Sequence, residues 1–227
     1  MRVVISIGGS VLAPGLEADR VEAHADTIDG LVDAGHEVAA IVGGGDVARQ
    51  YINTARDLGA TEYDLDTLGI DVTRLNARLL ITALERSAAP EPAESHEDAR
   101  ASLRRGEGAV MGGTVPGHTT DAVAALLAEM VEADLLVYAT SVPGVFSADP
   151  NENETAEQYD RLTASELVDV ISSIQIAAGS NAPIDLLATK IIERSGLRAV
   201  VLDGTTPSRI ADAVAGDVDG TEVVPDG

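Results

Sequence analysis

The stretch Val3-Val4-Ile5-Ser6-Ile7-Gly8-Gly9-Ser10 holds the pattern on which the fold of this chain is built. Its apolar, mostly β-branched first part predicts a buried strand, and the glycine pair after it predicts a tight turn into a helix. The same succession recurs where residues 37–42 precede Gly43-Gly44-Gly45, and where residues 108–111 precede Gly112-Gly113-Thr114. Strands followed by glycine-rich turns and helices are typical of an α/β fold.

The rest of the chain continues this alternation. Further apolar, β-rich runs predict strands at 134–139, 198–202 and 221–224. Helical spacing predicts helices at about 17–34, 46–58, 64–86, 119–131, 163–173, 184–195 and 207–215. We therefore expect one domain with the α/β class of fold, a three-layer αβα sandwich around a mostly parallel sheet. The polar, proline-containing segment 87–97 is expected to be a linker between two lobes of that domain.

Length and composition exclude several classes of protein. A chain of 227 residues with 45% hydrophobic content can close one sizeable core. No stretch approaches 18 uncharged apolar residues, and the N-terminal residues read as a strand instead of a signal peptide, so a soluble, unexported protein without membrane contact is expected. Cysteine is absent, which excludes disulfides, thiolate catalysis and cysteine-ligated metals. Any metal must therefore be bound by oxygen ligands.

The charge balance is strongly acidic. Asp and Glu number 38 against 15 Lys and Arg, giving a net charge of −23 that is spread along the chain. Such a charge disfavours nucleic-acid binding, and its self-repulsion becomes tolerable near molar salt, where the Debye length is about 3 Å. We expect a protein from the cytoplasm of a salt-adapted cell, an ordinary acidic enzyme being the alternative. With one Phe, four Tyr and no Trp, ligand recognition must rely on backbone and short polar side chains.

The three glycine-rich turns predict a site for phosphate groups. Turns at the carboxyl ends of parallel strands line one crevice, and glycine lets backbone N–H groups approach an anion closely. One such turn could be a purely steric feature, but three in the same position favour a polyphosphate site. Neither the Gly-x-Gly-x-x-Gly dinucleotide fingerprint nor the Gly-x-x-x-x-Gly-Lys phosphate loop is present, which argues against a Rossmann dehydrogenase and a P-loop kinase.

Two longer loops add polar groups to this crevice. The third glycine turn continues through residues 114–121, where Thr119 or Thr120 could cap a helix that Asp121 also favours. The remaining hydroxyl, imidazole and glycine donors suit a small, phosphorylated, hydroxyl-rich ligand. In the segment 140–150, Phe146 lies among turn-forming residues. An adenine ring could rest on it, and a packed aromatic in a simple turn is the alternative.

Taken together, residues 7–12, 42–51, 111–129 and 140–150 resemble the motifs of the amino acid kinase family, and within it those of the archaeal type of UMP kinase. The resemblance covers essentially the whole chain. It implies the amino acid kinase fold, with an acceptor-binding lobe at about 1–130 and an ATP-binding lobe at about 131–227. It further implies transfer of the γ-phosphate of ATP to UMP in pyrimidine nucleotide synthesis, with Mg²⁺ accompanying ATP, and a homo-oligomer, most commonly a hexamer.

The resemblance also implies roles for individual residues. Contacts to the ATP phosphates are implied for Gly9, Ser10, Gly45 and Arg49, and contacts to adenosine for Thr140, Phe146 and Asp149. UMP contacts are implied for Gly44, Asp66, Thr114, Val115, Pro116, Gly117, His118, Thr119 and Thr120. A catalytic role is implied for Arg49 and for Lys190, the single lysine of the chain, with Asp121 orienting Lys190 or a metal-bound water. The protein ligands of the metal stay open.

Two positions depart from the pattern of the family. Relatives carry a lysine where this chain has Ser6, and others a lysine where it has Asp46, so the cations at the phosphates differ. Two alternative functions remain. The same fold serves kinases for acetylglutamate, aspartate, carbamate or isopentenyl phosphate, and it also serves non-catalytic nucleotide or oxyanion binding.

Overall fold

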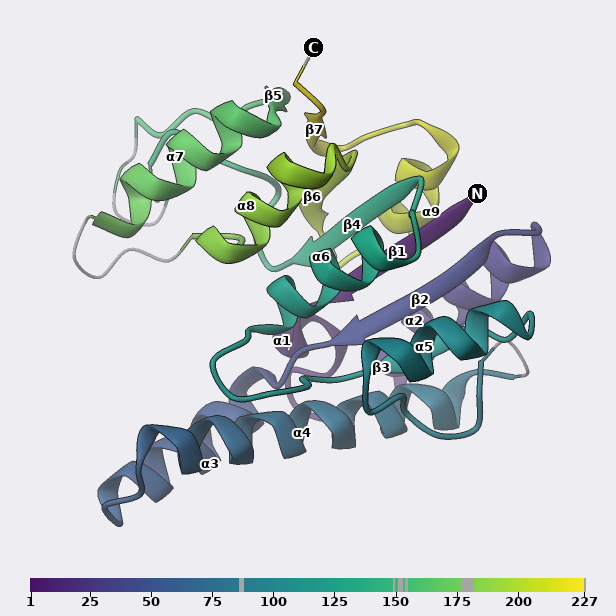
Figure 1. Cartoon of the computed structure of the whole chain (residues 1–227), viewed down its shortest axis with the longest axis vertical. Coiled ribbons are helices and arrows are strands. Elements are labelled where there is room, and N and C mark those ends of the chain that lie inside the picture. Colours follow the sequence, from purple (N-terminus) through teal and green to yellow (C-terminus); the bar gives the residue numbers. More distant parts are fainter. Residues whose placement is uncertain (86–87, 149, 151–152, 154, 177–181, 227) are drawn as a thin grey trace.

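Seven strands join into one sheet in the order β3-β2-β1-β4-β6-β7-β5 in the part of the chain that the computed structural model describes, residues 1–85, 88–148, 150, 153, 155–176 and 182–226 (Figure 1). The β6–β7 pairing is antiparallel and the other pairings are parallel. The strands are β1 (Arg2–Ile7), β2 (Glu37–Val42), β3 (Ala109–Met111), β4 (Leu135–Thr140), β5 (Arg161–Thr163), β6 (Ala199–Asp203) and β7 (Gly220–Val224).

Helices cover both faces of this sheet. They are α1 (Gly9–Leu12), α2 (Ala18–Asp33), α3 (Gly45–Asp57), α4 (Glu62–Ala83), α5 (His96–Arg104), α6 (Thr120–Met130), α7 (Ala164–Ile176), α8 (Leu186–Ser195) and α9 (Ser208–Ala215). None of these described helices is long and apolar enough to cross a membrane. The pair α3 and α4 packs together and extends past the sheet (Figure 1).

The three layers follow from the alternation of side chains along the central strands. Val4 packs into a core with apolar side chains of α5, α6, α7 and α8, whereas its neighbours Val3 and Ile5 pack on the opposite face with those of α2, α4 and α9. Both faces are therefore buried, as a parallel sheet requires. Each fully buried Leu or Ile contributes about 1.5–3 kcal/mol to this arrangement. The predicted αβα sandwich with a mostly parallel sheet is confirmed.

All six predicted strands and all seven predicted helices are present, with ends shifted by three residues or fewer. Three short elements were missed. The three residues of β5 are too few to show a period, and the four residues of α1 were included in the first glycine turn. The third, α5, begins where a linker was expected, because the Ser95 hydroxyl caps it by accepting the Asp98 N–H at 3.1 Å.

The expectation that residues 87–97 join two lobes is wrong for the described part of that segment. Ala89 N–H donates to the Gly108 carbonyl at 2.8 Å, and Ala93 N–H donates to the Val110 carbonyl at 2.8 Å. The segment thus runs along β3 at the edge of the sheet and then enters α5, which packs on β2, β3 and α6. It belongs to the N-terminal half of the molecule because its backbone donors are satisfied there.

Candidate active site

The glycine turns after β1 and β2 are packed against each other. A Cβ atom on Gly9 would lie 2.2 Å from the backbone nitrogen of Gly45, a contact that only glycine avoids. The Asn76 side chain of α4 donates to the Gly43 carbonyl at 2.8 Å and so fixes the turn after β2 against α4. The two turns therefore form one rigid floor at the carboxyl ends of the strands, as the sequence predicted.

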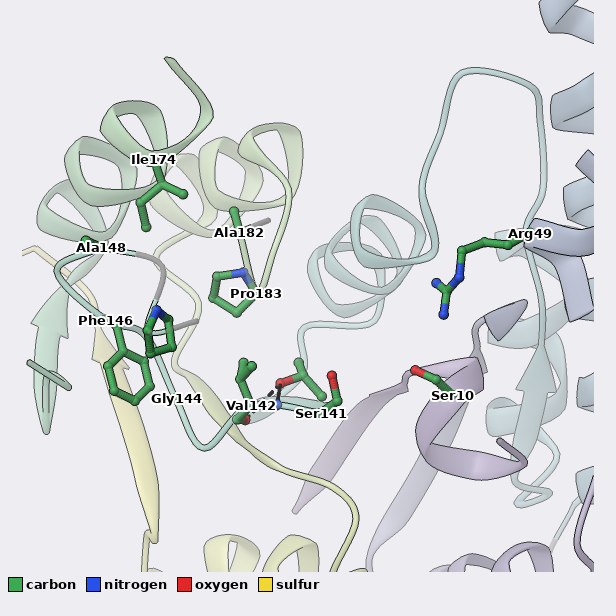
Figure 2. Close-up of a pocket in the computed structure, with 12 residues that line it drawn as sticks. Ser10, Arg49, Ser141, Val142, Gly144, Phe146, Ala148, Ile174, Ala182 and Pro183 are labelled. Atoms are coloured by element: carbon green, nitrogen blue, oxygen red, sulfur yellow. Dashed lines mark hydrogen bonds between the residues drawn. The ribbon is translucent and has the colours of Figure 1, made fainter. Parts of the chain in front are cut away.

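A first cavity of about 510 Å³ opens beside this floor (Figure 2). Arg49 and Ser10 lie at one end of it, and Phe146, with the apolar side chains of Ile174, Ala182 and Pro183, lies at the other. The remaining lining residues are Thr140, Ser141, Val142, Gly144, Ala148 and Pro150. One end is thus polar and cationic and the other apolar, which matches a ligand with a phosphate tail and an aromatic head.

A second cavity of about 390 Å³ lies between α3, α4 and the loop that precedes α6. It is lined by Gly44, Gly45, Ala48, Arg49, Ile52, Asp66, Gly69, Ile70, Thr73, Gly113, Gly117, His118, Thr119 and Thr120. The predicted UMP residues Gly44, Asp66, Gly117, His118, Thr119 and Thr120 are among them. Small residues, hydroxyls, one imidazole and one carboxylate surround this space, so it suits a compact polar ligand.

Arg49 lines both cavities and is the charged side chain that they share. It projects from α3, one turn after the glycine triplet, and its guanidinium pairs with the Asp46 carboxylate at 2.5 Å. Asp46 thus orients the arginine side chain. A group moving from one cavity to the other would pass this guanidinium.

Side chains of α4 hold the loop 112–120 in three places. The Asp66 carboxylate accepts the Gly117 N–H at 2.8 Å, and the buried Thr73 hydroxyl accepts the Gly113 N–H at 2.6 Å. Arg74 donates to the Gly113 carbonyl at 3.2 Å. A Cβ atom on Gly112 would lie 2.4 Å from the Thr73 hydroxyl, so the loop can approach α4 only through glycine. The loop 112–120, which forms one wall of the second cavity, is therefore preorganised.

A half-buried acidic group lies at the base of this region. Thr119 caps α6 by accepting the Ala122 N–H at 3.1 Å, and its hydroxyl donates to the Asp185 carboxylate. Ser6, in β1, donates its hydroxyl to Asp121 at 3.2 Å. Burial, reinforced by the negative charge of Asp185, raises the pKa of Asp121 to about 7, although the hydrogen bonds from Ser6 and from the Asp185 N–H oppose this shift.

This raised pKa predicts a pH dependence of stability. Between about pH 4 and pH 7 the folded protein keeps a proton on Asp121 that the unfolded chain has lost, so stability should fall as the pH rises through this range. The Asp121→Asn variant should lack this part of the slope and should melt at a higher temperature than the parent at pH 8. Thermal melts of both proteins from pH 4.5 to pH 8 in 2 M KCl measure it. Parallel curves would contradict the prediction.

Some predicted residues do not line either cavity. Thr114 is half-buried, with a hydroxyl that has no partner among the described residues, and Val115 is exposed. Pro116 is half-buried in the same loop, and Gly9 is buried within the floor, where it packs against Gly45. Gly45, expected at ATP, lines the second cavity instead. Asp149 lies outside the described residues.

The structure does not bring Lys190 to Arg49 or Asp121. Lys190 lies on the exposed face of α8, where its ammonium group pairs with Glu193 at 3.1 Å, and it lines neither cavity. It follows Asp185 by five residues, which at 100° per residue turns it by roughly 140° around the helix. Since Asp185 faces Asp121, Lys190 points away from it. No contact between Lys190 and Asp121 is present among the described residues, and the Asp121 side chain meets Ser6 and Asp185 instead, so the catalytic role of Lys190 stays a prediction that no contact here supports.

Sequence reasoning missed the supporting residues Thr73, Arg74, Asn76 and Asp185. A signal for the residues of α4 does exist. Asp66, Gly69, Thr73 and Asn76 recur at helical spacing, so these small and polar positions share one face of α4. Asp185 precedes α8 as its N-cap, accepting the Ala188 N–H at 2.9 Å, and reads in the sequence as a capping residue only.

Comparison with known proteins shows the family of this chain. The model of the amino acid kinase family matches residues 1–203. The chain belongs to the amino acid kinase family. Among curated members, the uridylate kinase of Natronomonas pharaonis is 82% identical over 225 residues, covering 99% of each chain. The uridylate kinase of Halobacterium salinarum is 68% identical over 228 residues, covering 100% of this chain and 95% of that protein.

A solved structure of the amino acid kinase family has the same architecture. The crystal structure of uridylate kinase from Archaeoglobus fulgidus superposes with a TM-score of 0.90 at 46% identity, and the match covers 99% of this chain and 100% of that one. The family and fold that the motifs predicted are thus confirmed over nearly the whole length.

Proposed function

We propose that this protein is a UMP kinase, which transfers the γ-phosphate of ATP to UMP and so gives ADP and UDP for pyrimidine nucleotide synthesis. The observation that carries the proposal is that Arg49 borders two separate cavities, one with an aromatic end and one with polar, glycine-lined walls. The first would hold ATP and the second UMP. The identity to uridylate kinases over full length supports this choice of acceptor.

The two cavities also support a division into two lobes. The second cavity is lined entirely by residues before position 121, whereas most of the first is lined by residues after 139. An acceptor lobe at about 1–130 and an ATP lobe at about 131–227 would meet at Arg49. Ser10 and Arg49, from the first half, would then contact the phosphate tail of ATP.

The reaction needs alignment and charge stabilisation from this chain. A phosphate oxygen of UMP is already anionic and attacks the γ-phosphorus directly, so no general base is required. Backbone donors of the glycine floor bind phosphate oxygens, and the Arg49 guanidinium stabilises the charge that spreads over the transferred group. The preorganised 112–120 loop positions the acceptor. Asp66 would accept hydrogen bonds from the ribose hydroxyls with the oxygen that Gly117 leaves free.

Magnesium would accompany ATP. The lining of the first cavity offers oxygen donors, the hydroxyls of Ser10, Thr140 and Ser141, and no cluster of three acidic or histidine side chains occurs among the described residues. This set fits an ion that binds mainly phosphate oxygens and water. Bound there, Mg²⁺ would neutralise charge on the ATP phosphates, while the hydroxyls hold its water ligands.

Acceptor choice tests the proposed function. UMP should be phosphorylated far faster than AMP, GMP or acetylglutamate in an ADP-release assay, because the second cavity is small and polar. The Asp66→Ala variant should raise the KM for UMP by roughly tenfold or more, as expected for loss of hydrogen bonds to a carboxylate, and should leave the KM for ATP unchanged. Asp71→Ala, on the exposed face of the same helix, serves as the control. An equal rise for both substrates would remove Asp66 from the acceptor site.

We further propose that the protein works as an oligomer, a hexamer as in its family, in the cytoplasm of a salt-adapted cell. Large apolar side chains on α3 and α4 and at their ends are exposed, namely Tyr51, Leu58, Tyr63 and Leu75. These helices extend past the sheet and offer a surface for a second copy. The net charge of −23 supports the salt adaptation.

Salt should therefore control both stability and assembly. Below about 0.2 M KCl the Debye length exceeds roughly 7 Å, so repulsion among the acidic side chains should loosen the fold and the oligomer. Circular dichroism melts and light scattering across a KCl series measure the two effects. A melting temperature that stays constant from 0.1 to 3 M would exclude the halophilic interpretation.

A further inference from the structure

A cavity of about 280 Å³ lies at the opposite end of the sheet from the candidate active site. It is lined by Arg2, Arg100, Leu103, Arg104, Met130, Val131 and Glu132. The helix α6 connects the two regions, since it begins at the second nucleotide cavity and ends here. Its eleven residues span about 16 Å, so the arginine cavity is distinct from both nucleotide cavities.

Two of its arginines lack the partners that arginines elsewhere have. Among the described residues, Arg100 and Arg104 are the two arginines with neither an ion pair nor a hydrogen bond. In a chain with 38 acidic residues a partner is easily supplied, and the next residue, Arg105, pairs with Glu107 at 2.7 Å. Two free guanidinium groups in one cavity are therefore unusual for this molecule.

The arrangement of these arginines favours an anion between them. Arg100 and Arg104 are four residues apart on α5, so they share one face of the helix and their like charges repel each other. Arg2 is already engaged, with Glu37 at 2.7 Å and with the Val131 carbonyl. Glu37 therefore offsets the charge of Arg2, and Arg100 and Arg104 are the free donors of the cavity. Glu132, which also lines the cavity, offsets one of their two charges.

We propose that this arginine cavity binds a small anion that carries two linked phosphate groups. A guanidinium presents a planar fork of N–H donors that matches two oxygens of a phosphate, and two forks on adjacent turns match two such groups. These hydrogen bonds act at contact distance, so they persist at molar salt, where the Debye length of about 3 Å removes longer-range attraction. The proposal does not depend on which acceptor the active site uses.

Titration calorimetry of inorganic pyrophosphate into the full-length protein in 1 M KCl tests the proposal. Excess AMP and UMP, neither of which carries two linked phosphate groups, keep the nucleotide cavities filled, and Mg²⁺ is omitted. We expect one pyrophosphate per chain. The double variant Arg100→Gln/Arg104→Gln should bind at least tenfold more weakly, whereas Arg105→Gln, which removes the same charge one residue away, should bind within twofold of the parent.

Several results would overturn the proposal. These are no binding by the parent, unchanged binding by the double variant, or an equal loss in Arg105→Gln, which would show a general effect of charge. Sulfate at the same concentration should bind at least tenfold more weakly than pyrophosphate, and equal binding would show a site for any anion. Because Arg100 and Arg104 lack protein partners, the double variant should melt within about 2 °C of the parent. A loss of binding in this variant can then be distinguished from a loss of folding.

Discussion

Replacing Arg49 by glutamine is expected to lower the kcat of phosphoryl transfer by a factor of about 10²–10³, the loss typical of one donor to a transition state. The reason is the position of the side chain. Arg49 is the charged residue that both cavities share. Its guanidinium is bonded to Asp46 of the same helix and to no backbone group among the described residues, so the fold should not depend on it. Glutamine keeps part of the hydrogen-bonding capacity and removes the charge. The KM values for ATP and UMP should change much less than kcat.

Two matched variants show whether position or charge matters. Arg56→Gln removes an arginine from the same helix, one that pairs with Asn53 and lines neither cavity, so its kcat should stay within about threefold of the parent. Lys190→Ala should behave likewise, because the ammonium group of Lys190 pairs with Glu193 on an exposed face. If Lys190→Ala lost 10²-fold and Arg49→Gln did not, Lys190 would be the catalytic cation and α8 would have to move to deliver it.

The strands and helices could be predicted because their cause is local. In 38–42 and 135–139, unbroken apolar runs mark strands buried on both faces, and glycine follows the predicted α2 and α3 at their ends. The position of the phosphate floor was predictable for the same reason, since parallel strands bring their carboxyl ends to one edge. The strand β5 was not predicted, because its three residues form a strand only by pairing with β7, whose partner residues lie 61 positions later.

The residues that support the site were harder to predict than those that line it. Asn76 reads as an ordinary polar residue within a helix, yet its amide holds the Gly43 carbonyl of a turn 33 residues earlier. Lys190 is the opposite case. Being the single lysine made it conspicuous, but sequence alone does not tell which face of α8 packs on the core. The burial of Ala188, Thr189, Ile191 and Ile192 leaves Lys190 facing outward.

The Gly9→Ala variant should be strongly destabilised by the single methyl group that it adds. The added carbon would lie 2.2 Å from the Gly45 nitrogen and 2.5 Å from the Gly43 oxygen, and both contacts are to backbone that cannot rotate away. The turns after β1 and β2 would have to separate. Overpacking of this kind costs about 1–3 kcal/mol or more, so the melting temperature should fall by several degrees. The kcat should fall by at least tenfold, because the phosphate floor consists of these two turns.

The neighbouring glycine supplies the control for this prediction. A Cβ atom on Gly8 would meet its nearest neighbour, a methyl group of Val11, at 3.5 Å, an ordinary contact distance, and its φ of −56° suits any residue. Gly8→Ala should therefore melt within about 2 °C of the parent and keep most of its activity. Thermal melts and an ADP-release assay in 2 M KCl compare the two variants directly. Equal effects of the two substitutions would mean that the close approach of Gly9 to Gly45 does not hold the floor together, and that the phosphate donors must lie elsewhere along the strand ends.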